Sequence, residues 1–519
     1  MAGGRDCDVL VVGLGPVGAL LALLLGRRGI SVIAIDRAEG IYELPRAAVV
    51  DDEVLRVFQE AGVVERVMEE AQIQEEVKFV TARGRKVRFL NPVAGNQGHP
   101  PLVSINQPAL ERSLAAGIAE TPSVEVRRGC SLKRFDQDGE GVTAHLRSST
   151  GVADTVRARY LVGTDGGGSL VRRLLGIEFG GSTFRQRWLV VDVHVDRPLA
   201  KVPHPHFYGD WRRPIVSLPM SPGRHRWEWM LHPGEDEAPF LEPGSLRERI
   251  DPWLDGQNVE IERAVVYTFH ARTASRWRDG RVFLAGDAAH VMPPFVGQGF
   301  SSGARDALNL AWKLEAVLRG APDGLLDAYE AERRTHVRSM TRLALTLGGL
   351  VQTTDRRVAA VRDAYLNFME WTGIARWLEE RIKPVPAYGR GAFAEQPHRL
   401  PPKRGVGSQF PQPLVRAGGA GGEELLLDEL IGPGWSAVAT DVEAAKVLGA
   451  EGLRTLVVGR DFGDPDGVIT EWLDRFESDW VVLRPDRFAF ALGSGAAAVP
   501  TALAALHGQV WKTAEHAAT

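Results

Sequence analysis

The chain has 519 residues, more than one hydrophobic core usually supports, so we expect two or three domains. Hydrophobic residues make up 44% of it, charged residues 25%, and its formal net charge is −4, which is typical of a soluble globular protein and gives no sign of nucleic-acid binding. We find no run of about 18 apolar residues and no apolar leader before the first strand, so we expect a cytoplasmic protein without a membrane span.

The first predicted strand ends in a glycine-rich turn. The apolar residues 9–12 run into Gly13, Gly15 and Gly18, spaced as GxGxxG, and an apolar helix follows, then a second strand that ends at Asp36. Glycines here let the backbone approach a pyrophosphate at a helix amino end, and an acidic residue about 20 positions later can bond a ribose hydroxyl. Glycine-rich turns are common, so this motif is weak evidence by itself.

Two later apolar strands end in comparable turns. One ends at Asp165 and Gly166 before a helix, and the other, much further along the chain, ends at Gly286 and Asp287. The returning strand indicates that both halves of a long segment hold one nucleotide cofactor. This arrangement favours a bound FAD over a diffusible nicotinamide.

The segments between and after these turns have two different patterns. Residues 75–105 and 185–270 show the apolar alternation of β-strands, interrupted by Pro and Gly turns. Helices are predicted at 107–120, 302–319 and 325–350. We therefore predict an α/β protein in which a Rossmann-type domain carries an inserted β-sheet domain that covers the flavin.

The order of the three turns resembles that of the single-component (class A) flavoprotein aromatic hydroxylases, the group that includes p-hydroxybenzoate and phenol hydroxylases. The resemblance covers roughly residues 6–385. Within the group the chain is most similar to the 3-(3-hydroxyphenyl)propionate hydroxylases. The segments that carry this closer likeness are residues 45–53, 213–214, 226–229, 233–236 and 297–299.

The C-terminal part of the chain has its own composition. Residues 386–421 are rich in Pro, Gly and Arg and predict a linker, and residues 422–519 resemble the thioredoxin-like domain of many of these hydroxylases, best at residues 483–486. The two cysteines, Cys7 and Cys130, lie outside it, so thiol redox chemistry is excluded there and packing or dimer formation is expected, which leaves a homodimer open. Their spacing predicts neither a disulfide nor a metal site.

The resemblance implies an enzyme and its cofactors. FAD would be bound non-covalently and reduced by NADH or NADPH, and O₂ would then give a flavin C4a-hydroperoxide that hydroxylates a phenolic ring, such as a 3-(3-hydroxyphenyl)propionate-like compound. The predicted domains are FAD-binding at 1–74, 106–184 and 271–385, substrate-binding at 75–105 and 185–270, a linker at 386–421, and a thioredoxin-like domain without CxxC at 422–519.

The motifs and the resemblance assign residues to FAD. The first turn should hold the pyrophosphate, Asp36 the adenosine ribose, and Asp287 a ribityl hydroxyl. The backbone N–H groups of residues 297–303 should face the flavin pyrimidine edge, because they lie at a helix amino end. His290 is expected to fix its loop. The predicted cofactor-binding residues are Gly13, Gly15, Gly18, Asp36, Arg37, Arg46, Gln107, Asp165, Gly286, Asp287, Pro293, Gly297 and Gly299.

Arg37 is considered because it follows Asp36, whereas Arg46, Gln107 and Asp165 depend mainly on the resemblance. Arg37 could lie along the adenine or be solvated. Arg46 matches an arginine near the pyrophosphate, whose two charges a cation would help to offset. Gln107 matches a glutamine near the ribityl chain. Asp165 would serve near FAD and NAD(P)H and could also cap the helix after it.

The substrate should lie on the inserted sheet, so residues 204–232 are the place to find its contacts. A histidine or tyrosine near a phenolic hydroxyl would aid deprotonation, and an arginine could pair with a propionate. The period of two places Trp227 and Trp229 on one strand face, and one face is expected to be core. No single catalytic residue can be chosen from His206, Tyr208, Arg213, Arg226, Trp227, Glu228 and Trp229.

Two alternative functions stay open at this point. The same scaffold could hydroxylate a larger aromatic, such as a polyketide or an antibiotic, and pocket volume would discriminate between these substrates. A non-catalytic flavin-binding module would belong to another class of protein, and the complete set of FAD motifs argues against it.

Overall fold

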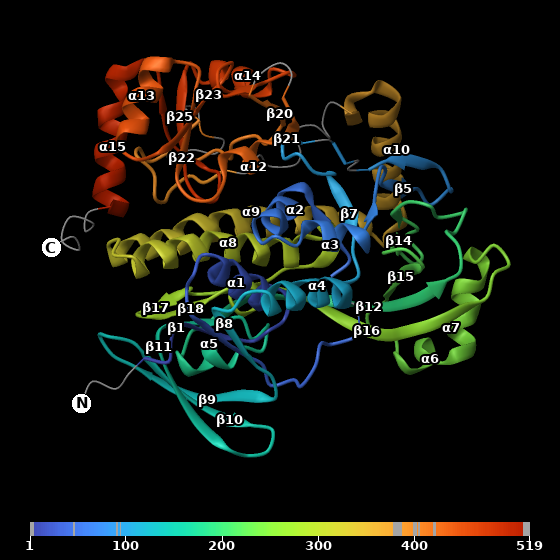
Figure 1. Ribbon diagram of the computed structural model, residues 1–519. Coiled ribbons are helices and arrows are strands. Elements are labelled where there is room, and N and C mark those ends of the chain that lie inside the picture. Colours follow the sequence, from blue (N-terminus) through green and yellow to red (C-terminus); the bar gives the residue numbers. More distant parts are fainter. Residues whose placement is uncertain are drawn as a thin grey trace.

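The computed structural model organises the chain around two large sheets and a separate C-terminal α/β unit (Figure 1). The residues that it describes are 5–44, 47–89, 92–93, 95–376, 387–397, 402, 405–418 and 422–511.

The first sheet is of the Rossmann type. Its strands in spatial order are β17 (Arg278–Asp279), β18 (Val282–Leu284), β11 (Ala153–Gly163), β1 (Cys7–Val12), β2 (Val32–Ile35) and β8 (Val124–Arg127), with the hairpin of β9 (Cys130–Gln137) and β10 (Val142–Ser148) beside β11. The strands from β18 to β8 are parallel. Residues 9–12 of β1 are buried. Helices cover both faces of a parallel sheet, which explains why this run is continuously apolar rather than alternating.

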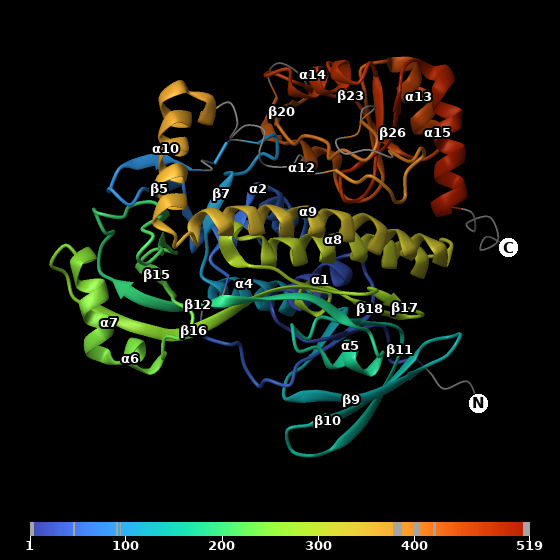
Figure 2. The ribbon, with the colours of Figure 1, turned by 180° about the vertical axis from the view of Figure 1, so that it is seen from behind.

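Helices pack on this sheet and on one another. The apolar α1 (Pro16–Arg27) is buried along most of its length and contacts α4 and α8. The other helices of this part are α2 (Asp52–Glu60), α3 (Val64–Glu69), α4 (Gln107–Ala119), α5 (Leu170–Leu174), α8 (Gln298–Leu318), α9 (Asp327–Val351) and α10 (Arg356–Thr372). Figures 1 and 2 show α8 and α9 side by side, between the first sheet and the C-terminal unit.

The second sheet is antiparallel apart from one parallel pair. Its order is β19 (His290–Val291), β16 (Val259–Ala274), β12 (Phe179–Val195), β15 (Arg224–Leu231), β14 (Ile215–Pro219), β13 (His206–Tyr208), β5 (Lys78–Val80) and β6 (Lys86–Arg88). One face packs on α6 (Ala238–Leu241) and α7 (Pro243–Ile250) through an apolar cluster that includes Leu246 and Ile250. The other face turns toward the first sheet and α9.

Both segments that were predicted to form the inserted sheet contribute strands to it. The first segment supplies β5 and β6, and the second supplies β12 to β16. β7 (Leu102–Ser104) instead joins a small sheet, between β3 (Val49–Asp51) and β4 (Gln72–Ile73). The residue boundaries of the domains stay predictions.

The C-terminal unit is thioredoxin-like. Its sheet has the order β23 (Arg454–Val457), β22 (Ser436–Ala439), β25 (Trp480–Leu483) and β26 (Ala489–Gly493), in which only β22 and β23 are parallel. Apolar clusters cover both faces of it. The remaining elements are β20 (Leu414–Ala417), β21 (Glu424–Leu426), β24 (Phe462–Gly463), α12 (Leu427–Ile431), α13 (Val442–Ala450), α14 (Val468–Arg475) and α15 (Val499–Leu506). The predicted fold class is thus confirmed.

Candidate active site

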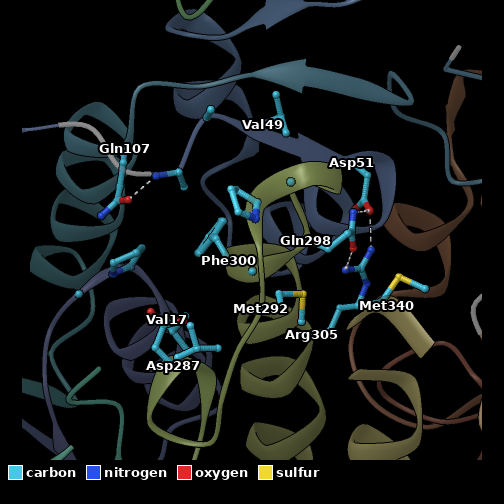
Figure 3. Close-up of a pocket in the computed structure, with 18 of the residues that line it drawn as sticks. Val17, Val49, Asp51, Gln107, Asp287, Met292, Gln298, Phe300, Arg305 and Met340 are labelled. Atoms are coloured by element: carbon cyan, nitrogen blue, oxygen red, sulfur yellow. Dashed lines mark hydrogen bonds and ion pairs between the residues drawn. The ribbon is translucent and has the colours of Figure 1, made fainter. Parts of the chain in front are cut away.

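A large cavity lies where the two sheets and the amino ends of α1 and α8 meet. Its volume is about 1340 Å³, above the ~300–1,000 Å³ typical of a pocket for one drug-sized ligand. The turns after β1, β2, β11 and β18 all line it, at the edge where open α/β sheets bind ligands. Figure 3 shows part of the lining, with Gln107 and Met340 on opposite sides. The cavity therefore joins the predicted cofactor turns to the second sheet.

The amino end of α1 opens into this cavity at Gly15. Within the described chain no side chain caps α1. A Cβ added to Gly15 would meet no atom within 4 Å, whereas one on Gly18 would lie 1.9 Å from the carbonyl oxygen of Gly13. Gly13 and Gly18 thus permit close packing, while Gly15 leaves room for a ligand. Gly13 and Gly15 line the cavity and Gly18 does not.

The amino end of α8 faces the same cavity. Its N-terminal flanking residue is Gly297, which has a φ of 65°, and no capping side chain is found among the residues described. Gly297 and Gly299 line the cavity, whereas Gly286 and Pro293 do not. The dipoles of two uncapped helices favour negative charge. The site therefore fits a cofactor such as FAD, which has an anionic pyrophosphate and a flavin that gains negative charge on reduction.

The turn after β2 is held by Asp36. Its carboxylate accepts hydrogen bonds from the backbone N–H groups of Leu14 (2.7 Å) and Ala38 (2.8 Å), which ties this turn to the glycine turn. Asp36 and the exposed Arg37 both line the cavity. A carboxylate has further lone pairs, so these bonds leave Asp36 able to accept from a ribose hydroxyl.

Gln107 and Asp165 line the cavity and also organise its walls. The Gln107 side chain accepts from the backbone N–H of Ala47 and donates to Glu111, both at 2.8 Å. The Asp165 carboxylate accepts from the backbone N–H groups of Leu170 (2.6 Å) and Val171 (3.1 Å), so it caps α5 as the sequence suggested. The predicted site residue Arg46 lies outside the described residues.

The loop after β18 presents Asp287 to the cavity. Asp287 is exposed, and its neighbours in this loop are buried. His290 fixes the loop through the carboxylate of Asp306 (2.6 Å), where backbone hydrogen bonds were expected. Asp306 also accepts from the backbone N–H of Gly286 (3.2 Å) and from Arg333 (2.8 Å). Through Asp306, helix α8 thereby holds this loop in place.

A buried ionic cluster on the cavity wall was missed from the sequence. Arg305 of α8 donates to the carboxylate of Asp51 at 2.6 Å and to that of Glu53 at 2.8 Å. Gln298 bonds to both Arg305 and Asp51. Figure 3 shows the side chains of Asp51, Gln298 and Arg305 converging. The carboxylates of residues 51–53 lie within 4.8 Å of one another. Segments 45–53 and 297–299, on which the family resemblance rests, contain the other residues of this cluster. No local sequence motif indicates that Arg305 belongs to it.

One face of β15 in the second sheet turns toward the cavity. Arg226 and Glu228 line the cavity, whereas Trp227 and Trp229 lie in the apolar cluster with α6 and α7. Successive side chains of a strand point to opposite faces, so this split follows the period of two. The expected core face is thus the tryptophan face.

The other predicted substrate contacts lie away from the cavity lining. On β13 the side chain that lines the cavity is Phe207. His206 is buried, which lowers its pKa to about 4, and Tyr208 packs on Trp253. Arg213 pairs with Glu235 at 2.6 Å.

Comparisons with known proteins agree with this geometry. The FAD binding domain family matches residues 6–344, and the HcaD C-terminal domain family matches residues 457–509. The chain belongs to the FAD binding domain family and is a FAD-dependent aromatic hydroxylase, a monooxygenase that uses O₂ and NAD(P)H.

Three relatives illustrate the similarity. A 3-(3-hydroxy-phenyl)propionate/3-hydroxycinnamic acid hydroxylase of Mycobacterium sp. (strain JLS) is 37% identical, over 93% of this chain and 88% of its own length. A probable NADH-specific resorcinol 4-hydroxylase of Rhodococcus jostii (strain RHA1) is 36% identical, over 96% and 94%. The structure of aklavinone-11 hydroxylase with FAD and aklavinone has a TM-score of 0.80 and 28% identity, covering 98% of this chain and 99% of that one.

None of the helices in the described part of the chain combines the length and the apolar character needed to cross a bilayer.

Proposed function

We propose that this enzyme hydroxylates a phenol that carries a short acidic side chain, such as 3-(3-hydroxyphenyl)propionate. The observation that carries the proposal is the cavity itself, in which the cofactor turns of the first sheet share one space with Arg226 and Glu228 of the second sheet. The relatives from Mycobacterium and Rhodococcus are named as hydroxylases of 3-(3-hydroxy-phenyl)propionate and of resorcinol, both small phenols, which supports the substrate class.

In this proposal the chain holds FAD by both helix ends. The uncapped α1 end at Gly15 would take the pyrophosphate, Asp36 the adenosine ribose, and Asp287 a ribityl hydroxyl. The α8 end at Gly297 would face the flavin ring and favour its reduced, anionic form. The bound flavin would supply hydride acceptance from NAD(P)H and oxygen transfer from O₂.

The other predicted cofactor residues have supporting roles. Arg37 would lie near the adenine, and Gln107 would position the loop that contains Ala47. Asp165 would keep the amino end of α5 next to the cofactor. A role for Arg46 at the pyrophosphate stays a prediction.

The apolar wall of the second sheet supports an aromatic substrate. Val216, Leu218 and Phe207 line the cavity beside Phe295 of the loop that precedes α8. Such a wall excludes water and holds a ring by dispersion and hydrophobic contacts. Arg226, on the same face, is a cation that a substrate carboxylate could approach, and its bond to Asp192 (2.6 Å) fixes its position.

The test follows NAD(P)H oxidation in the purified holoenzyme. 3-(3-Hydroxyphenyl)propionate should accelerate the oxidation at least ~10-fold, equivalent to about 1.4 kcal/mol of barrier, and the product should gain one oxygen by mass. Rapid oxidation without any phenol, unchanged across a broad phenol panel, would refute the substrate class.

A larger aromatic substrate is the second candidate. The likeness to the structure of aklavinone-11 hydroxylase with FAD and aklavinone supports it, and the cavity of about 1340 Å³ has to hold FAD as well as the substrate. Including a tetracyclic aglycone in the panel separates the two, since one substrate should give hydroxylated product and the other only peroxide. The cytoplasmic location and the homodimer stay predictions from the sequence.

A further inference from the structure

Glu228 interrupts an apolar row that crosses the second sheet. Directly opposite it are Val190 on β12 and Val216 on β14, and the row continues to Val265 on β16 and Phe207 on β13. Directly paired residues of antiparallel strands lie on the same face. Glu228 is therefore a carboxyl group set among valines on the face that lines the cavity.

Glu228 is a nearly buried residue of the cavity wall. It is 8% exposed, and it belongs to the cavity lining. Across the part of the chain that the structure describes, no hydrogen bond or ion pair is made to its oxygens. A carboxyl group beside apolar side chains and with little access to water gains from a hydrogen bond, so a ligand that supplies a hydroxyl donor would be bound well there.

The neighbouring charges leave Glu228 available for a ligand. Arg226 donates twice to Asp192 (2.6 and 3.1 Å), and Arg263 lies 3.9 Å from the same carboxylate. These three are the charged groups that act on Glu228 from its own strand and from β12 and β16. Burial raises the pKa of Glu228, and the charge of Arg226 lowers it only in part. A more basic carboxylate is closer to the ~10 of a phenol, so a proton passes between them more readily.

We propose that Glu228 binds the phenolic hydroxyl of the substrate and accepts its proton. This inference rests on the proposed function and adds the residue that recognises the reacting ring. While oxygen is added to a ring carbon, a ring π pair forms the new C–O bond, the substrate O–H bond breaks and its electron pair becomes the second bond of a C=O group, and the proton forms a bond to a Glu228 oxygen. The hydrogen on the newly oxygenated ring carbon then moves through water to the substrate oxygen, which restores the aromatic ring. The neutral carboxylic acid returns the proton to water when the product leaves.

The first test measures binding rather than turnover. The affinities of 3-(3-hydroxyphenyl)propionate and of 3-phenylpropionate, which lacks the hydroxyl, are compared through the absorbance change of the bound flavin. The wild type should prefer the hydroxylated acid by ~10-fold or more, because a site built to bond a hydroxyl rejects the analogue without it. Glu228→Leu, which matches the apolar neighbours, should lose the preference, and Glu260→Gln at an exposed position of β16 should keep it.

A second variant separates hydrogen bonding from proton transfer. Glu228→Gln can still bond the hydroxyl but cannot take its proton, so it should keep most of the binding preference. Its yield of hydroxylated product per NAD(P)H should be low and independent of pH, where the wild-type yield rises as Glu228 ionises. Flavin content and thermal unfolding identify any variant that fails to fold, and the Gln variant keeps the shape of the side chain.

The two proposals fail in different ways. A wild-type enzyme that binds neither acid and hydroxylates no phenol would refute the proposed function. A wild type that hydroxylates the phenol, together with a folded Glu228→Leu variant that keeps the hydroxyl preference, would refute the role of Glu228 alone. A pH-dependent product yield that is unchanged in Glu228→Gln would refute the proton transfer.

Discussion

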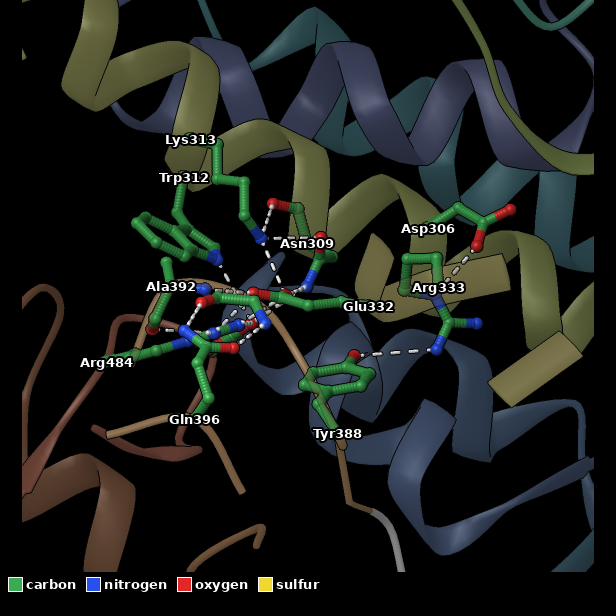
Figure 4. Close-up of polar contacts among 12 residues, drawn as sticks. Asp306, Asn309, Trp312, Lys313, Glu332, Arg333, Tyr388, Ala392, Gln396 and Arg484 are labelled. Carbon is green, nitrogen blue, oxygen red and sulfur yellow. Dashed lines mark hydrogen bonds and ion pairs between the residues drawn. The ribbon is translucent and has the colours of Figure 1, made fainter. Parts of the chain in front are cut away.

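Arg484 of the C-terminal domain and Glu332 of α9 form a buried bidentate ion pair. The two nitrogen–oxygen distances are 2.8 and 2.9 Å, and both side chains are fully buried (Figure 4). Lys313 of α8 lies 2.8 Å from the same carboxylate, and Trp312 donates to Asp486 at 3.0 Å. A bidentate pair of planar groups fixes the relative orientation of its two partners and also contributes to the interaction energy. The C-terminal domain is thus joined to the helices that carry the cofactor site.

Replacing Arg484 with Met should destabilise the whole protein. The substitution leaves Glu332 and Asp486 buried with less compensating charge, a change that costs about 3–5 kcal/mol. Arg416→Met is the matched control, because Arg416 pairs with Glu424 where both side chains are about half exposed, and such pairs contribute at most about 1 kcal/mol. Urea unfolding should show the difference, and equal midpoints for the two variants would contradict it.

The same substitution should weaken flavin retention. Glu332 is followed on α9 by Arg333, which donates to Asp306, and Asp306 holds the backbone of Gly286. A shift of α9 would therefore loosen the loop that presents Asp287. Dialysis followed by absorbance should show faster flavin loss from Arg484→Met than from Arg416→Met. Identical flavin contents would limit the ion pair to a purely structural role.

Replacing Asp287 with Ala should lower the affinity for FAD. One lost charge-assisted hydrogen bond is equivalent to roughly 1.5–3 kcal/mol, or about ten- to hundred-fold in affinity. Asp466→Ala, at an exposed position of the C-terminal domain, is the control. Flavin released by heating should be FAD, which also tests non-covalent binding. Equal FAD content in both variants would remove Asp287 from the site.

Two glycines at the amino end of α8 should respond differently to a methyl group. Gly297 has a φ of 65°, and an added Cβ would lie 2.2 Å from Val49, whereas one on Gly299 would meet its nearest neighbour only at 4.0 Å. A left-handed non-glycine residue costs about 1–2 kcal/mol. Thermal unfolding of the apoprotein should therefore fall in Gly297→Ala and stay nearly unchanged in Gly299→Ala. The reverse order would show that the turn differs in solution.

Acid should destabilise the protein partly through His225. Burial lowers the pKa of His225 to about 3, and the ring bonds to the Ser217 hydroxyl at 2.8 Å. Between about pH 6.5 and 3 the unfolded chain takes up a proton that the folded chain does not, so the free energy of unfolding falls as the pH falls. The slope from one proton is about 1.4 kcal/mol per pH unit. His225→Gln should show a shallower slope in urea titrations at several pH values, and parallel slopes would contradict the prediction.

The sequence alone was sufficient for the scaffold and its cofactor. Continuous apolar strands that end in glycine and aspartate turns are local signals, because the parallel sheet buries both faces of each strand and the turn needs particular residues. The same local logic placed Trp227 and Trp229 together on one face of β15, and the structure confirms that this face is core.

What only the tertiary structure decided was which face meets the cofactor and which distant groups meet each other. Periodicity separates Phe207 from its neighbours His206 and Tyr208 but does not say which side turns to the flavin, since that depends on how two sheets pack. Ion pairs such as Arg305 with Asp51 and Arg484 with Glu332 join residues far apart in the chain, and charged residues carry no local mark of a remote partner. Such pairs form only on folding, because a charge that is removed from water requires a compensating group and the fold can bring that group from any part of the chain.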